Sequence, residues 1–526
     1  MNSFNRRDFL KFLGLSSTAL VLNSCSSLSF LNSESSLSQL NSGLSLKSVL
    51  GEFKAIAASE LDELVLDESF TYNIIRSWGD KILNSKSKNI DFGYNNDYIE
   101  FLPLNEKEAL LFVNHESVNP LEVIGEKAQS KVVGVSIFKI KQNSSSEWVF
   151  DEDLTEQEKY NWTVDANRIC KVSGPVQEEY AEMKGTLANC SGTKTLWGTV
   201  LTCEENYHNF KDLYLWQDFD MNQYGWIVEI DPYTKNSIPV KHTALGKMAH
   251  ENAALALADN SQVVVYMGDD KANEHIYKFV SDKVFNENDK DYLSKGKLYV
   301  AKFDKSLDFT KAESGSGTWE LLSLENSTLK KIFKSEAELL LETRKAAKLL
   351  KASPTDRPES ITVSPKSKEV FIALTNNYDK GNDFGSIFKI SESGQDHGSL
   401  SFNYENFALG GEETGFTCPD NIQFASDNSL WIATDISGKA INKNQYKFHG
   451  NNSLFVIPLE GEHSGKALRF ASAPNGAELC GICFDEKSQT LFLSVQHPGE
   501  IGTNSSWPNL NNDKKARSSV VAIQKK

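Results

Sequence analysis

The sequence predicts an all-β protein, a six-bladed β-propeller with inserted loops and a few short helices. From about residue 100 onward, short apolar strand segments alternate with polar turns, and helical patterns are few. One pattern also recurs, an apolar strand followed by a polar turn and a stronger apolar strand. Copies begin at residues 361, 422 and 482, about 60 residues apart, and looser copies cover 102–116 and 253–269. Antiparallel hairpins repeated in this way favour a propeller. A β-sandwich or several small β domains is the alternative.

The composition excludes some classes of protein. The chain has 526 residues, including 30 Phe, 16 Tyr and 9 Trp, which is enough apolar surface for a buried core and excludes a disordered chain. Its formal net charge is −16 and it has no basic stripe, so nucleic acid is not expected as a structural partner. An anionic substrate would need local compensation from metal ions or a well-placed Arg.

The N-terminus predicts export. Residues 1–24 combine a polar start, the pair Arg6-Arg7 and a short apolar run, as in a signal peptide for the twin-arginine export machinery. The segment Leu22-Asn23-Ser24-Cys25 resembles a lipoprotein cleavage box, which predicts lipidation of Cys25 and membrane attachment. Simple cleavage near Ser24 is the alternative. Either outcome places the mature protein in the periplasm or at the cell surface.

The remainder divides into a tether and one domain. Residues 25–48 are rich in Ser, Leu and Asn without a sustained period and predict a flexible, lipid-anchored tether. Residues 49–526 predict a single catalytic propeller domain, interrupted by a helical insertion over 335–350. The six remaining cysteines are too sparse for a disulfide scaffold. Cys480 and Cys483 have C-x-x-C spacing, which here favours two strand cysteines over a redox or zinc site.

Acidic residues recur just ahead of the repeated hairpins. Glu251, Glu359 and Asp420 each lie two residues before the first apolar residue of a hairpin. Because the innermost strands of a propeller line its axis, these carboxylates should converge there, and bound cations would offset their repulsion. Further candidates follow strands, namely Glu116, Glu204, Glu205 and Asp270. Any one of them alone is more typical of a turn or surface carboxylate.

No competing catalytic motif is present. The sequence lacks a G-x-S-x-G elbow, a P-loop and an H-E-x-x-H helix. Its nine His residues are scattered, and His250 and His497 could each be a hydrogen-bonded structural histidine.

Several segments together resemble the secreted PhoX-type alkaline phosphatases. They occur in order over roughly residues 100–500, and only the combination is specific. The segments are 189–205 (NCSGTKTLWGTVLTCEE), 225–232, 241–251, 268–279, 356–359, 416–421 and 495–499. Leu196 and Ser360 depart from the family pattern, where Pro and an acidic residue are usual, which puts substrate choice in more doubt than metal binding.

The resemblance implies a six-bladed propeller that holds ferric and calcium ions and hydrolyses phosphate monoesters outside the cytoplasm. It implies that Cys190, Glu251 and Glu359 bind iron, and that Arg357 grips the substrate phosphate. The implied calcium ligands or their supports are Glu204, Asp420, Glu116, Glu205, Asp270 and Asn421. The implied catalytic residues are Arg357, Glu359 and Cys190.

Two other functions stay open from the sequence. A non-catalytic, calcium-stabilised binding module would keep the carboxylates but would need neither Cys190 nor Arg357. A propeller hydrolase for phosphodiesters or lactones would use the same oxygen-rich channel on another ester. A substrate panel at alkaline pH, with and without chelator, distinguishes these functions.

Overall fold

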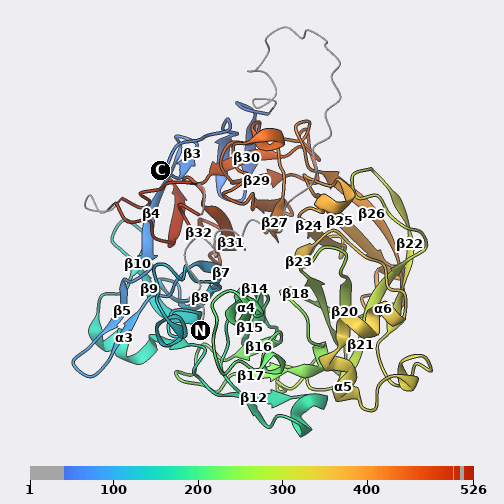
Figure 1. Ribbon diagram of the computed structural model, residues 1–526. Coiled ribbons are helices and arrows are strands. Elements are labelled where there is room, and N and C mark those ends of the chain that lie inside the picture. Colours follow the sequence, from blue (N-terminus) through green and yellow to red (C-terminus); the bar gives the residue numbers. More distant parts are fainter. Residues whose placement is uncertain (1–40, 501–502, 510–513) are drawn as a thin grey trace, which may run out of the picture. The chain divides into compact units, whose positions relative to one another are not determined.

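The computed structural model describes residues 41–500, 503–509 and 514–526 and is mostly β (Figure 1). The predicted signal peptide, Cys25 and most of the predicted tether lie outside the described residues. The last residues of that tether, Ser45–Ser48, form strand β1, which pairs with β2 (Gly51–Lys54). No helix in the described part of the chain is long and apolar enough to cross a bilayer.

The strands form sheets that follow one another along the chain. The first contains β7 (Asn96–Asn105), β8 (Glu108–His115), β9 (Gly134–Gln142), β10 (Trp148–Phe150) and β11 (Trp162–Val164). The second contains β12 (Cys170–Ser173), β13 (Glu182–Met183), β14 (Asn189–Lys194), β15 (Val200–Glu204), β16 (Ile227–Ile230) and β17 (Val240–His242).

A nine-stranded sheet follows. It contains β18 (His250–Leu257), β19 (Gln262–Asp269), β20 (Ile276–Val284), β21 (Gly296–Phe303), β22 (Ser314–Leu321), β23 (Pro358–Val363), β24 (Val370–Leu374), β25 (Ser386–Glu392) and β26 (Ser401–Leu409). Its order is β18-β19-β20-β21-β22-β26-β25-β24-β23, so two successive antiparallel runs are joined where β22 pairs with β26.

Two more sheets complete the series, and each takes one strand from the N-terminal region. One contains β27 (Pro419–Phe424), β28 (Leu430–Thr434), β29 (Ser453–Ile457), β30 (Leu468–Ser472) and β3 (Val65–Leu66). The other contains β31 (Glu478–Phe484), β32 (Thr490–Gln496), β33 (Ser519–Lys525) and β4 (Phe70–Ser77). The short strands β5 (Lys81–Asn84) and β6 (Asn89–Asp91) pair with each other.

One edge strand of each of the larger sheets, and both edge strands of the nine-stranded sheet, lie around a common centre (Figure 1). We call them the central strands; they are β7, β14, β18, β23, β27 and β31. β7 contacts β14, β14 contacts β18, and the series continues through β23, β27 and β31 back to β7. The fold is therefore propeller-like, as the sequence predicted. Apolar clusters fill the spaces between neighbouring sheets, with fully buried rings such as Trp162, Trp226 and Trp431.

Helices are short and lie between strands. The α-helices are α2 (Glu126–Gln129), α3 (Leu154–Tyr160), α4 (Asn209–Asp212), α5 (Glu336–Leu341) and α6 (Thr343–Leu349). The insertion predicted as one helix over 335–350 is two helices, separated at Glu342. Ser335 caps α5 by accepting a hydrogen bond from the Glu338 N–H.

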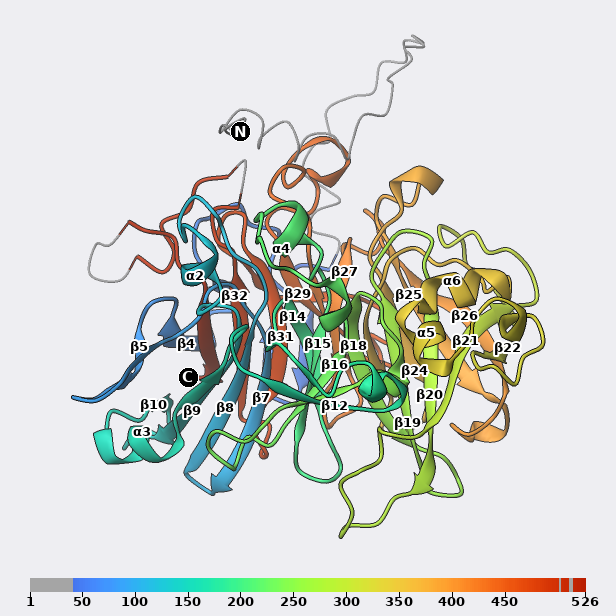
Figure 2. The same cartoon turned by 60° about the horizontal axis from the view of Figure 1, so that its bottom comes forward.

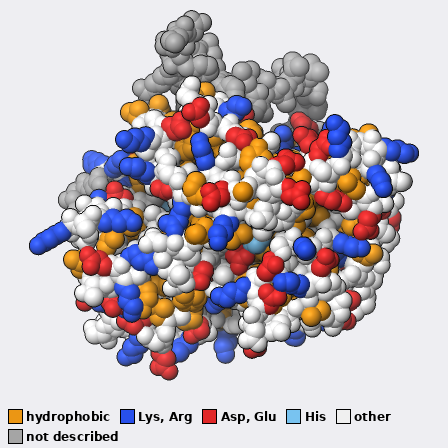
Figure 3. All heavy atoms as spheres, turned by 90° about the horizontal axis from the view of Figure 1, so that it is seen from below, with side chains coloured by type: hydrophobic (Ala, Val, Ile, Leu, Met, Phe, Trp, Pro, Cys, Tyr) orange, Lys and Arg blue, Asp and Glu red, His pale blue; other side chains and the backbone are white. Residues whose placement is uncertain are grey.

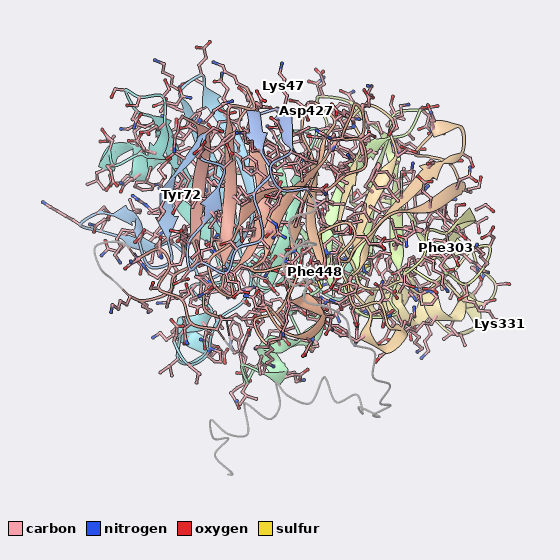
Figure 4. The ribbon with its side chains drawn as sticks, turned by 90° about the horizontal axis from the view of Figure 1, so that it is seen from above. Lys47, Tyr72, Phe303, Lys331, Asp427 and Phe448 are labelled. Atoms are coloured by element: carbon pink, nitrogen blue, oxygen red, sulfur yellow. The ribbon has the colours of Figure 1, made fainter. Side chains whose placement is uncertain are left out.

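The connections occupy two ends of the strands. Figure 2 shows α2 and α4 at one end, and hairpin turns such as that between β7 and β8 at the other. Within one sheet, Figure 4 shows Asp427, in the turn between β27 and β28, at the opposite end from Phe448, in the loop between β28 and β29. The end that carries α4 and Phe448 also carries the beginnings of the central strands, because each central strand runs from this end toward the hairpin turns.

Candidate functional site

Each central strand has a β-bulge near its beginning. In β18, for example, the pairing with β19 shifts between His250 and Ala253. The same shift occurs in β7, β14, β23, β27 and β31, between Asn96 and Ile99, Asn189 and Gly192, Pro358 and Ile361, Pro419 and Ile422, and Cys480 and Cys483. Bulges redirect side chains locally and are frequent beside active sites.

In each central strand, the pairing shifts after one particular residue, such as His250 in β18. The next residue along the chain is acidic or a cysteine in all of these strands but one. We call this set the bulge ring; it consists of Asp97, Cys190, Glu251, Glu359, Asp420 and Gly481. Its members come from the five larger sheets, and side chains from neighbouring sheets meet. The Cys190 thiol donates to Glu251 Oε1 at 3.1 Å and to Asp97 Oδ2 at 3.3 Å. All five non-glycine members are buried.

A second set of acids comes from the ends of the second strands. We call Glu116, Glu205, Asp270 and Asp435 the strand-end acids, because they directly follow β8, β15, β19 and β28. Glu205 shares a group with Cys190 and Glu251 in which potential ligand atoms lie within 4.8 Å of one another, and Glu116 shares one with Asp97 and Cys190. The strand-end acids therefore extend the bulge ring toward the same end of the strands.

The sheet that begins with β31 contributes to the cluster through other residues than the bulge ring. Gly481 takes the bulge-ring position, where an added Cβ would lie 2.3 Å from the Asp97 carbonyl oxygen. Instead, β31 and β32 extend further, so that Glu478 and His497 approach Asp435. Potential ligand atoms of these three residues also lie within 4.8 Å of one another.

The electrostatics of this cluster are unfavourable without cations. Burial, followed by repulsion from Glu116 and Asp420, raises the pKa of Asp97. Burial and the neighbouring Asp435 raise the pKa of Asp420 to about 7. Burial, and then Asp97 and Glu251, raise the pKa of the Cys190 thiol. Nearby carboxylates that cannot all ionise are typical of a site built to hold positive charge.

Unpartnered oxygen atoms support the same conclusion. Asp97 Oδ1 and Asp435 Oδ1 are buried and have no hydrogen-bond partner among the described residues. Buried polar atoms are nearly always satisfied, so such atoms indicate a missing ligand or water. Carboxylate oxygens with one sulfur suit hard cations together with a metal that accepts thiolate. The described residues thus form candidate acidic metal-binding clusters.

One cation of the protein lies at the edge of the cluster. Arg357 Nε donates to Asp270 Oδ1 and Nη2 to Asp270 Oδ2, both at 2.8 Å, and Nη2 also donates to Glu359 Oε1 at 2.8 Å. This ion pair holds the pKa of Asp270 below its usual value despite burial, unlike its neighbours. The Arg357 side chain is 35% exposed, and Nη1 has no hydrogen-bond partner among the described residues. The guanidinium is therefore fixed on one side and open on the other.

The backbone at Arg357 is strained. Its φ is +57°, and the residues at the same place before β7, β14 and β27, which are Asn95, Ala188 and Cys418, also have positive φ. Left-handed conformations at non-glycine residues cost about 1 kcal/mol or more and cluster at functional sites. The strain recurs where the chain enters the central strands.

The structure keeps one predicted ligand apart from the cluster. Glu204 is buried, forms an ion pair with Lys241 at 2.8 Å and accepts a hydrogen bond from the Gly225 N–H at 3.0 Å. Successive side chains of a strand point to opposite faces, so Glu204 and Glu205 cannot both point to the centre. Asp269 repeats this arrangement, because it pairs with Arg344 while Asp270 joins the cluster.

The other predicted residues lie in or beside the cluster. Asn421 is hydrogen-bonded through both polar atoms, since its Nδ2 donates to Asp420 Oδ1 at 2.8 Å and its Oδ1 accepts from the Gly481 N–H at 3.0 Å. It therefore supports Asp420 and has one remaining lone pair at most. All six cysteines of the described residues are buried and free. Cys480 and Cys483 lie in β31, as predicted for strand cysteines.

Three residues of the cluster were not predicted from the sequence, namely Asp97, Asp435 and Glu478, and His497 was left as an open alternative. Two of them carried a usable signal. Asp97 lies two residues before Ile99, the spacing that identified Glu251, and Asp435 follows a strand as Asp270 does. By contrast, charges on the face seen in Figure 3 are interspersed in sign, so the acidic cluster is not part of a wider acidic surface on that face.

The family description "Alkaline phosphatase PhoX" matches residues 51–499. The chain belongs to the PhoX alkaline phosphatase family. Pseudomonas fluorescens PhoX, solved in complex with vanadate as a transition state analogue, is 30% identical with a TM-score of 0.80, over 91% of this chain and 98% of that one. The chain is accordingly a phosphoric ester hydrolase, and the family predicted from the sequence motifs is confirmed.

More distant structures are also similar to this chain. A gluconolactonase from Xanthomonas campestris is 9% identical with a TM-score of 0.35, over 90% of this chain and 98% of that one. A protein of unknown function from Dyadobacter fermentans is 9% identical with a TM-score of 0.42, over 89% and 100%. A comparison with curated proteins gave no match.

Proposed function

We propose that this protein is an exported alkaline phosphatase that hydrolyses phosphate monoesters and releases inorganic phosphate with a cluster of Fe³⁺ and Ca²⁺. One observation carries the proposal, namely the convergence of buried carboxylates and one thiol beside a partly exposed Arg357. Family membership and the vanadate complex of the Pseudomonas fluorescens relative support it.

The fold belongs to the same proposal. We infer a six-bladed propeller in which the nine-stranded sheet supplies two blades, one beginning at β18 and one at β23. The ring of six adjacent central strands and the repeated bulge at one register favour this count. The β22–β26 pairing then joins two blades at their outer edges.

The donor set suits two kinds of ion. Cys190, with Glu251 and Glu359, offers the mixed sulfur and oxygen donors that suit iron. Asp420, Glu116, Glu205, Asp270 and Asp435 offer the oxygen-rich surroundings that suit calcium. When bound, such ions supply Lewis acidity toward a phosphoryl oxygen and activate water as a nucleophile.

The protein's own contribution centres on Arg357. Asp270 and Glu359 hold two of its nitrogens, which leaves Nη1 to donate to a phosphate oxygen. A guanidinium fixed in advance stabilises charge that develops on the equatorial oxygens without reorganising during the reaction. The ion pair with Glu359 also couples the position of Arg357 to a proposed iron ligand.

Export and anchoring complete the proposal. We propose that residues 1–24 direct the chain to the twin-arginine machinery, that Cys25 carries lipid, and that the enzyme acts in the periplasm or at the cell surface. Twin-arginine export carries folded proteins, which suits a protein that acquires metal before it leaves the cytoplasm.

The test measures metal and turnover on one sample. Protein exported through its own signal is assayed for elemental content and for hydrolysis of p-nitrophenyl phosphate, before and after chelation. We expect iron and calcium together, and loss of turnover with loss of metal. Bis-p-nitrophenyl phosphate tests the diester alternative in parallel. Full turnover after complete metal removal would contradict the proposal.

A further inference from the structure

A second buried cationic group lies in the sheet that contains β29 and β30. Arg469 on β30 is only 6% exposed, and its Nη1 donates to Ser453 Oγ on β29. No carboxylate of the described residues lies within ion-pair distance of its guanidinium. Burying an ionised group without a counter-charge is strongly unfavourable, so an arrangement of this kind needs a compensating partner.

The immediate neighbours do not supply that partner. Ser453 Oγ donates to the Asn451 carbonyl oxygen at 2.9 Å, so it can only accept from Arg469. The Arg469 guanidinium carbon lies 4.7 Å from the centre of the Phe455 ring. This cation–π contact is favourable but provides no negative charge.

Two further polar side chains nearby lack a well-formed hydrogen bond. His449 is fully buried, and neither ring nitrogen makes a hydrogen bond of good geometry among the described residues, although the backbone of Gly450 and Asn451 lies close by. Its ring centre lies 5.7 Å from that of Phe455, the ring that Arg469 also covers. His449 follows Phe448, which is labelled in Figure 4.

Ser472 completes the group. It lies directly opposite Ser453 in the β29–β30 pair, so the two side chains are on the same face of the sheet. Its Oγ is buried and has no hydrogen-bond partner among the described residues. Arg469, His449 and Ser472 can all donate hydrogen bonds, and none of them supplies a negative charge.

We propose that Arg469, His449 and Ser472 bind one buried monovalent inorganic anion, a halide such as chloride. A water molecule could satisfy the hydroxyl and the imidazole but could not neutralise the guanidinium. Burial, and then Arg469, lower the pKa of His449, so the histidine stays neutral and the group carries a single positive charge. One positive charge matches a small monovalent anion better than a phosphate dianion.

The first test is thermal unfolding in sodium chloride and in sodium gluconate at equal ionic strength and constant calcium. Wild-type protein should show a saturable rise in Tm of about 1–2 °C with chloride, because a ligand that binds only the folded state stabilises it. Arg469→Met should lose this rise and should be at least as stable as wild type in gluconate, because Met removes an uncompensated buried charge. Arg168→Met, which alters a partly exposed arginine that donates to backbone carbonyls, should keep the rise.

The second measurement needs no variant. Crystals of wild-type protein soaked in bromide should show an anomalous peak beside Arg469 and His449. Absence of that peak, or an equal chloride response in wild type and Arg469→Met, would overturn the proposal. If Arg469→Met does not fold, the bromide experiment still decides.

Discussion

Replacing Asp420 by Asn should have opposite effects on the metal-free and the metal-loaded protein. Asp420 is buried in the bulge ring, and burial together with Asp435 raises its pKa from 3.8 to about 7. The folded metal-free protein therefore binds more protons than the unfolded chain between these pH values. Its stability falls as the pH rises through that window, and the loss is complete above it.

The magnitude follows from the shift. A difference of about three pKa units corresponds to about 4 kcal/mol at pH 8, as an upper value because the neighbouring carboxylates share the effect. Asn carries no charge and can still accept from Asn421 Nδ2, so Asp420→Asn should stabilise the chelated protein by up to this amount at pH 8 and hardly at all at pH 4. In the loaded protein the same change removes a proposed cation ligand and should lower both metal content and Tm.

The assay is denaturant unfolding of wild type and Asp420→Asn, with chelator and with calcium and iron, at pH 4, 6 and 8. Asp427→Asn is the matched control, because Asp427 lies in the exposed turn of the same hairpin and should change stability by less than about 0.5 kcal/mol. Destabilisation of the chelated protein by Asp420→Asn at pH 8 would refute the view that repulsion between acids dominates the metal-free cluster.

Other changes test separate parts of the site. Arg357→Lys should lower turnover at least tenfold while iron and calcium content stay unchanged, because Lys cannot keep the bidentate contact with Asp270 and also reach phosphate. Loss of metal in this variant would show that Arg357 is structural. Glu205→Gln should lower metal content. Glu204→Gln should retain metal but destabilise the fold by about 3–5 kcal/mol, because it leaves buried Lys241 without its anion. Equal metal loss in both variants would contradict the assignment of Glu204 and Glu205 to opposite faces of the strand. Cys190→Ser should abolish any visible thiolate-to-iron absorption and reduce iron more than calcium, as elemental analysis would show; an unchanged spectrum would argue against sulfur ligation.

Part of the site could be predicted because one register repeats. Glu251, Glu359 and Asp420 share a spacing to the following apolar residue, and in the structure this spacing is the β-bulge that opens each central strand. Asp97 has the same spacing, but its strand belongs to a looser copy of the repeat, in which the flanking residues differ. The spacing of Asp97 to Ile99 is present in the sequence, but it is the matching bulge in β7 that identifies it as the same position.

Other features depend on pairing that a single sequence does not specify. The choice between Glu204 and Glu205 depends on which residue faces the axis, and a shift of one residue exchanges the two faces. Glu478 reaches the cluster only because β31 and β32 extend two residues beyond the usual end of pairing. The junction of β22 with β26 likewise joins strands that are some 80 residues apart in the chain.

The final sheet holds strands from both ends of the described chain, since β33 pairs with β4 along its length. During synthesis, β4 must therefore wait until every strand from β5 to β32 has been made before its partner β33 follows. Glu478 belongs to this same sheet, so the sheet that carries part of the acidic cluster is incomplete until β33 has been made. A truncation before Ser519 would remove β33 and disturb the sheet that carries Glu478, even though no residue of the acidic cluster would be missing.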